Sequence, residues 1–231
     1  MEAKLKDTSG FYDGRGSEGL KDLKERLRAE PSESKSQQRG QSLLATGLAS
    51  LDHALGGGFP AGSLVELVGR QSSGVTSLAS SLAASVTSLG GQVAWIDPHN
   101  TLDPQSLLEV GINAHQFLWI RPHQNYLKYA LKAADTILDG GGFDLVVVDL
   151  LARRSSSKNL PLSTWMRLAK RLEHRNTTCV VLRNFPGVSS AQYRLRFLGG
   201  TFSGATVELQ KAQRKAVYSE SISLPFAPPF D

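Results

Sequence analysis

Residues 64–77 read Leu-Val-Glu-Leu-Val-Gly-Arg-Gln-Ser-Ser-Gly-Val-Thr-Ser, a short apolar run followed by a loop rich in glycine and serine. The run predicts a strand over Leu64–Val68, and apolar residues at helical spacing predict a helix over Ser77–Leu89. A strand, a glycine-rich loop and a helix in this order form the context of a phosphate-binding loop, because loop N–H groups and the helix N-terminus attract an anion. Residues 69–77 are therefore the centre of the candidate site.

This loop retains the glycine spacing of a phosphate loop but lacks its cation. The candidate nucleotide-binding residues are Gly69, Arg70, Ser72, Ser73, Gly74, Val75, Thr76 and Ser77, with Asp149 at the end of a later strand. A lysine normally follows the second glycine and neutralises phosphate, whereas valine neither donates a hydrogen bond nor carries charge. We expect no catalytic residue, no metal site and no cofactor beyond weak binding of ATP and Mg²⁺. Two alternatives remain: Arg70 substitutes as the cation, or the loop is kept only for its shape.

From Leu43 onward, short apolar runs alternate with helical periodicity. The expected strands are Gln92–Asp97, Phe117–Ile120, Leu145–Leu150 and Thr178–Leu182; the expected helices are Pro104–Val110, Tyr126–Leu138 and Leu162–Leu172, the last with Leu162, Trp165, Leu168 and Leu172 on one stripe. This alternation predicts an α/β fold with a mostly parallel sheet flanked by helices. Three runs without helices between them, Tyr193–Phe197, Ala205–Leu209 and Lys215–Ser219, predict antiparallel edge strands near the C-terminus.

The two ends of the chain differ from this core, which we place at residues 43–220. Residues 1–42 predict a flexible region with a short helix over 18–28, whose Leu20, Leu23 and Leu27 share one face, and a polar linker after it. Residues 221–231 form a tail rich in proline and phenylalanine. Its Phe226 and Phe230 either bind a partner groove or pack back onto the chain's own core.

Charge is unevenly distributed along the chain. Residues 1–150 hold 13 basic and 17 acidic residues, whereas residues 151–231 hold 13 basic residues and 4 acidic ones. A basic C-terminal third predicts an anionic partner, nucleic acid or an acidic protein face, or else a solvated surface. No stretch approaches the roughly 20 apolar residues of a membrane helix, and the N-terminus has no apolar signal segment, so we expect a cytoplasmic protein without a membrane partner.

Three segments around the loop resemble the RecA recombinases. They are Thr46–Asp52 with Gly56–Gly62, Ile96–Pro104 with its Leu-Asp-Pro, and Phe143–Asp149. Their order and spacing agree with the family over roughly residues 43–210, which is more specific than any one motif. The resemblance implies a RecA-like phosphate-loop core in which Asp149 supports Mg²⁺; a structural or helix-capping role for Asp149 remains the alternative.

The sequence departs from this family at further functional positions. The catalytic glutamate falls at His99, and the glutamine that senses the γ phosphate falls at Asn184. The two DNA-contacting loops of the family fall after Asp149 and after Asn184, and both are short here. The candidate DNA-binding residues are Arg153, Arg154, Lys158, Arg194 and Arg196, with ordinary exposed charge as the alternative.

Size, fold and the altered site also resemble ImuA, an accessory family of bacterial mutagenesis cassettes. That resemblance implies RecA and/or an ImuB-type polymerase homologue as partners, and DNA as a further one. Leu20, Leu23, Leu27, Phe226 and Phe230 are the candidate partner-binding residues. The expected function is that of a non-catalytic accessory protein in the DNA damage (SOS) response and translesion mutagenesis. The alternatives are an ATP-dependent, DNA-binding ATPase of the RecA/RadA type in recombinational repair, and a protein whose main role is direct DNA binding.

Overall fold

The structure, a computed structural model, describes residues 14–15, 42–122, 126–151, 160–201, 204–212 and 221–225. Its strands are β1 (Gly14–Arg15), β2 (Leu43–Leu44), β3 (Phe59–Pro60), β4 (Leu64–Val68), β5 (Val93–Ile96), β6 (Phe117–Arg121), β7 (Leu145–Asp149), β8 (Thr178–Arg183), β9 (Tyr193–Thr201), β10 (Gly204–Lys211) and β11 (Ser221–Pro225). Its helices are α2 (Ala49–Leu55), α3 (Val75–Ser88), α4 (Pro104–Glu109), α5 (Tyr126–Gly140) and α6 (Leu162–Leu172), with a 3₁₀ turn η1 at Ala114–Gln116.

Nine strands form one sheet in the order β1-β6-β5-β7-β8-β4-β9-β10-β11. Neighbouring strands from β1 to β9 pair in parallel, whereas β10 pairs antiparallel with both β9 and β11. The predicted α/β fold, with a mostly parallel sheet and antiparallel edge strands, is confirmed. One detail differs: β9 was expected within the antiparallel edge, but it runs parallel to β4, so the antiparallel part begins at β10.

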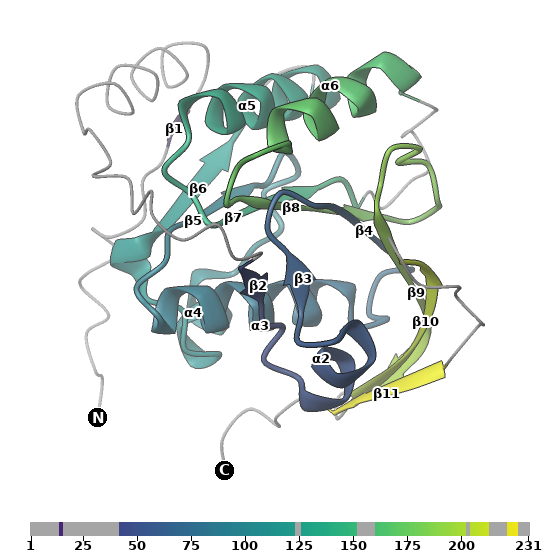
Figure 1. Cartoon of the computed structure of the whole chain (residues 1–231). Coiled ribbons are helices and arrows are strands. Elements are labelled where there is room, and N and C mark those ends of the chain that lie inside the picture. Colours follow the sequence, from purple (N-terminus) through teal and green to yellow (C-terminus); the bar gives the residue numbers. More distant parts are fainter. Residues whose placement is uncertain are drawn as a thin grey trace, which may run out of the picture.

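Helices cover both faces of the sheet, and each face has its own apolar core. Val65 and Leu67 of β4 pack in the core that contains α3 residues, whereas Leu64 packs in the core that contains residues of α5 and α6. Figure 1 shows α5 and α6 on one side of the sheet, and α2, α3 and α4 on the other. The strands β4, β7 and β8 are buried along their whole length because helices lie on both faces, which explains why their sequences are mostly apolar.

Both ends of the sheet include residues that the sequence placed outside the core. Gly14 and Arg15, from the region expected to be flexible, pair with Ile120 and Arg121 of β6. At the other end Ser221–Pro225 pair with β10, so the core extends past the boundary expected at residue 220. An edge strand tolerates the missing N–H of Pro225, and Ile222 and Leu224 are buried. The expected strand at 215–219 and the tail residues 226–231 lie outside the described residues.

Within the described ranges, no helix is long and apolar enough to span a membrane.

Candidate functional site

The loop after β4 keeps the backbone shape that its glycines predict. Gly74 adopts a left-handed conformation (φ 95°) just before α3, and no side chain caps the first N–H groups of that helix. The hydroxyl and the N–H of Ser73 both donate to the Arg70 carbonyl, at 2.6 and 3.2 Å. The segment therefore curls back before the helix begins, and leaves a helix N-terminus without a side-chain cap.

Val75 occupies the position of the phosphate-loop lysine, and its side chain belongs to the protein core. It is 2% exposed and packs in the apolar cluster on the α3 side of the sheet. A Cβ on Gly69 would lie 2.7 Å from Cγ2 of Val75 and 2.8 Å from Cβ of Phe197, so only glycine allows this approach. An apolar side chain thus packs at the base of the loop, in the place where a cation is required.

The other polar residues of the loop lie at the surface. Arg70, Ser72, Thr76 and Ser77 are exposed, and only Ser73 is buried. A hydroxyl at Thr76 therefore remains available to a ligand.

Asp97 comes directly after β5, and Asp149 is the last residue of the neighbouring strand β7. Asp149 is 3% exposed, and its Oδ1 accepts a hydrogen bond from the N–H of Leu151 at 3.0 Å. Burial raises the pKa of Asp149 to about 7; the hydrogen bond from Leu151 opposes the rise, and the charge of Asp97 adds to it.

Asp97 is fully buried and serves the local structure. Its Oδ2 accepts hydrogen bonds from the N–H groups of Thr101 and Leu102, at 2.8 and 3.0 Å, and from Nε1 of Trp119 at 3.3 Å. These donors hold the turn that follows β5. The same turn leaves His99 exposed, at the position where the resemblance implies a catalytic glutamate.

The structure gathers most of the predicted nucleotide site at one edge of the sheet. The loop from Gly69, the turn with His99, Asp149 and the half-buried Asn184 follow β4, β5, β7 and β8, and these strands all run parallel. The carboxyl ends of parallel strands are the usual place for a ligand site in α/β proteins. The residues present fit a phosphate loop in backbone shape, but they do not fit Mg²⁺·ATP in charge.

A buried ionic cluster next to the loop was missed by the sequence analysis. Glu66 of β4 is fully buried and accepts hydrogen bonds from the N–H groups of Gly187 and Val188, at 2.7 and 2.9 Å. Its Oε2 also binds Nε of Arg194 at 2.6 Å. Burial lowers the pKa of Arg183; Glu66 opposes this, and Arg194 adds to it. A single acid inside the apolar run Leu64–Val68 was the signal, because a buried charge needs a partner.

The cluster includes Arg194, one of the predicted DNA-binding residues. Arg194 is 22% exposed, and besides Glu66 it contacts the Val188 carbonyl at 3.3 Å, so its guanidinium already has a structural task. Arg196, two residues on, is exposed. Arg153, Arg154 and Lys158, as well as the predicted partner-binding residues Leu20, Leu23, Leu27, Phe226 and Phe230, lie outside the described residues.

Comparisons with known proteins agree with this architecture. The sequence model of the family described as RecA N-terminal domain matches residues 32–160. Protein RecA of Lactococcus lactis subsp. cremoris (strain MG1363) is 39% identical over 112 residues, which cover 48% of this chain and 28% of that protein. Protein RecA of Fusobacterium nucleatum subsp. nucleatum is 40% identical over 110 residues, or 47% of this chain and 29% of that protein. The match therefore spans less than a third of these relatives.

A solved structure shows the same fold over most of the chain. The crystal structure of the RadB recombinase superposes with a TM-score of 0.66, at 21% sequence identity, over 81% of this chain and 97% of that one.

Proposed function

Because this chain belongs to the RecA N-terminal domain family, we propose that it acts within that family as a non-catalytic accessory protein of the DNA damage response. Its partners are RecA and/or an ImuB-type polymerase homologue, and its place is in SOS-dependent translesion mutagenesis. The resemblance to ImuA in the altered site supports this assignment. A RecA-like protein that does not hydrolyse ATP would bind at the interface between RecA protomers and so occupy or cap it.

One observation carries the non-catalytic part of the proposal: the lysine position holds Val75, packed in the core at 2% exposure. Phosphoryl transfer depends on electrostatic stabilisation of charge that develops on the transferred group. A valine supplies none, and Arg70 is exposed at the outer part of the loop. We therefore assign the function to the protein's surfaces.

A nucleotide-binding experiment tests this part. The melting temperature of the full chain is measured with and without millimolar ATP and Mg²⁺, with a RecA protein as the positive control. We expect RecA to be stabilised and this chain to be unchanged. Ligand at 100 times its Kd stabilises a protein by about 2.7 kcal/mol. A rise in melting temperature that corresponds to this gain in stability, together with ATP turnover, would favour the ATPase alternative.

A second arm of the experiment tests the partner. Full-length RecA and an ImuB-type homologue are immobilised separately, and binding of the chain is measured at physiological salt. We expect at least one of them to bind, and Val75→Lys to bind equally well without gaining turnover. Lack of binding to both proteins would reject the accessory role while leaving the family assignment intact.

A further inference from the structure

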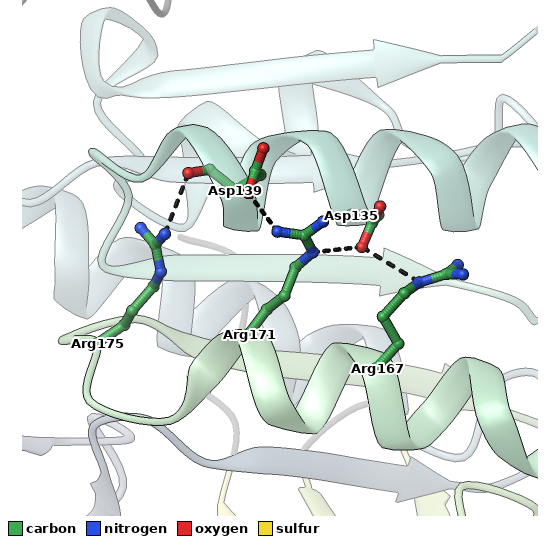
Figure 2. A network of polar contacts seen from close by, with 5 residues as sticks. All are labelled: Asp135, Asp139, Arg167, Arg171 and Arg175. Carbon is green, nitrogen blue, oxygen red and sulfur yellow. Dashed lines mark hydrogen bonds and ion pairs between the residues drawn. The ribbon is translucent and has the colours of Figure 1, made fainter.

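The helices α5 and α6 are joined by a row of ion pairs on their outer side (Figure 2). Asp135 and Asp139, one turn apart on α5, face Arg167, Arg171 and Arg175 from α6 and the loop after it. Nε of Arg171 lies 2.6 Å from Oδ1 of Asp135, and its Nη1 contacts Oδ1 of Asp139. Arg167 also lies 3.4 Å from Oδ1 of Asp135, so two arginines share the two carboxylates, while Arg175 donates to the backbone carbonyl of Asp139 at 3.1 Å.

The next face of α6 is apolar and exposed, which is unusual for a helix that covers a sheet. Leu162 was expected on the buried stripe, but it is 58% exposed, and Met166, one turn later, is 57% exposed. The buried stripe consists instead of Trp165, Leu168 and Leu172. Lys170 continues the row of Leu162 and Met166 at the same four-residue spacing and is exposed.

The charged residues of α6 itself are all basic. Helix α6 contains Arg167, Lys170 and Arg171 and no acidic residue. Arg167 is 56% exposed, and its Nε lies 3.4 Å from Asp135, so the arginine is oriented but remains accessible. Apolar side chains beside oriented cations are complementary to a helix that carries apolar residues on one face and carboxylates at its margin.

We propose that the face of α6 carrying Leu162, Met166, Arg167 and Lys170 is a docking site for an acidic amphipathic helix of a partner protein. The four-residue spacing of the row matches the spacing of side chains along one face of a helix. Half-exposed leucine and methionine gain by burial against apolar side chains. Carboxylates of the incoming helix extend the row of ion pairs that joins α5 to α6.

Nucleic acid fits this face less well. A phosphate backbone is bound through cations and other hydrogen-bond donors, so Leu162 and Met166, both more than half exposed, find no counterpart on phosphate. The face also lies on α6, apart from the phosphate loop between β4 and α3 (Figure 1). The proposal is therefore independent of whether RecA is the partner.

The test uses the full chain and defined probes in a fluorescence anisotropy titration. The probes are a labelled synthetic helix of about 20 residues with leucine on one face and glutamate elsewhere, a twin with lysine for glutamate, and a DNA duplex of similar length. The variants are Met166→Glu and Lys170→Glu. Their matched controls are Leu89→Glu, at an 83% exposed leucine after α3, and Lys211→Glu, at an exposed lysine of β10.

We expect the acidic helix to bind and the lysine twin not to bind. Met166→Glu and Lys170→Glu should each weaken binding about tenfold, since a central contact of an interface commonly contributes that much, while both controls leave it unchanged. The proposal is overturned if the acidic helix fails to bind, if the twin binds equally well, or if the controls lose as much affinity. Duplex binding weakened by Lys170→Glu and unaffected by Met166→Glu would also overturn it, in favour of a nucleic-acid surface. If the helix binds by this face but RecA and the polymerase homologue do not bind, only the proposed function fails.

Discussion

Asp149 is a buried carboxyl group whose protonation depends on folding. Its pKa rises from 3.8 in the unfolded chain to about 7 in the folded one, because burial disfavours the charged form. Between these two values the folded state holds a proton that the unfolded state has released. The free energy of unfolding therefore falls as the pH rises from about 4 to about 7. Outside that range, the contribution of Asp149 to the free energy of unfolding does not change with pH.

Replacing this residue by Asp149→Asn should remove that dependence. The amide oxygen can still accept the hydrogen bond from the N–H of Leu151, which is 3.0 Å from Oδ1 in the wild type. Between pH 5 and pH 8 we expect the variant to gain about 2–3 kcal/mol of stability relative to the wild type. Urea denaturation of both proteins at several pH values measures this difference. Parallel curves for the two proteins would contradict the assignment.

Two adjacent glycines of β9, Gly199 and Gly200, differ in how closely they approach the loop before α3. A Cβ on Gly200 would lie 2.6 Å from the Ser73 carbonyl oxygen, a backbone atom of the phosphate-like loop, whereas a Cβ on Gly199 would meet nothing within 4 Å. We expect Gly200→Ala to lower the free energy of unfolding by about 1–3 kcal/mol, because backbone must shift. Gly199→Ala is the matched control and should be neutral or slightly stabilising. Chemical denaturation checks both; equal effects would show that the loop and β9 are not in tight contact.

Among the elements, β4 is the one that several others depend on. It lies between β8 and β9, leads into the loop before α3, and carries Glu66, which holds the segment after β8 by two backbone N–H groups. Arg194 of β9 binds the same carboxylate. One acid thus ties together two strands, β4 and β9, and the segment after β8, at a fully buried position.

This arrangement separates two arginines of the same strand. Arg194→Gln removes the guanidinium that lies 2.6 Å from the buried Glu66, and we expect a loss of about 3 kcal/mol or more in the free energy of unfolding. Arg196→Gln, at an exposed position, should change it by about 0.5 kcal/mol or less. Denaturant titrations of the two variants under identical conditions give the comparison. Similar losses for both would argue against Glu66 as the centre of the cluster.

The elements that the sequence predicted well are those with strong local patterns. The strand at Leu64–Val68 was placed to the residue, because helices on both faces make it apolar at every position except Glu66. The helix α2 was not predicted, since its seven residues are too few to show a periodicity. The direction of β9 could not be read either: whether a strand runs parallel to β4 depends on pairing with residues far away in the chain. The same holds for the candidate site. The loop at residues 69–77 is one continuous segment and could be predicted, whereas the contact between Arg194 and Glu66 joins residues far apart in the chain and could not.

At the scale of the whole molecule, the central position of β4 has a consequence for how the chain folds. Both neighbours of β4 are strands that come more than a hundred residues later. Pairings of such sequence separation form slowly, since closing a long loop costs entropy before any contact repays it. At a synthesis rate of roughly 5–20 residues per second, β4 and its loop wait about 5–25 s for their partners to be made.

The family match, residues 32–160, ends before β8 begins, so those residues alone would leave both edges of β4 open. We therefore expect that residues 32–160 do not form a folding unit by themselves, and that β4 is prone to aggregation and to capture by chaperones until β8 and β9 have been made.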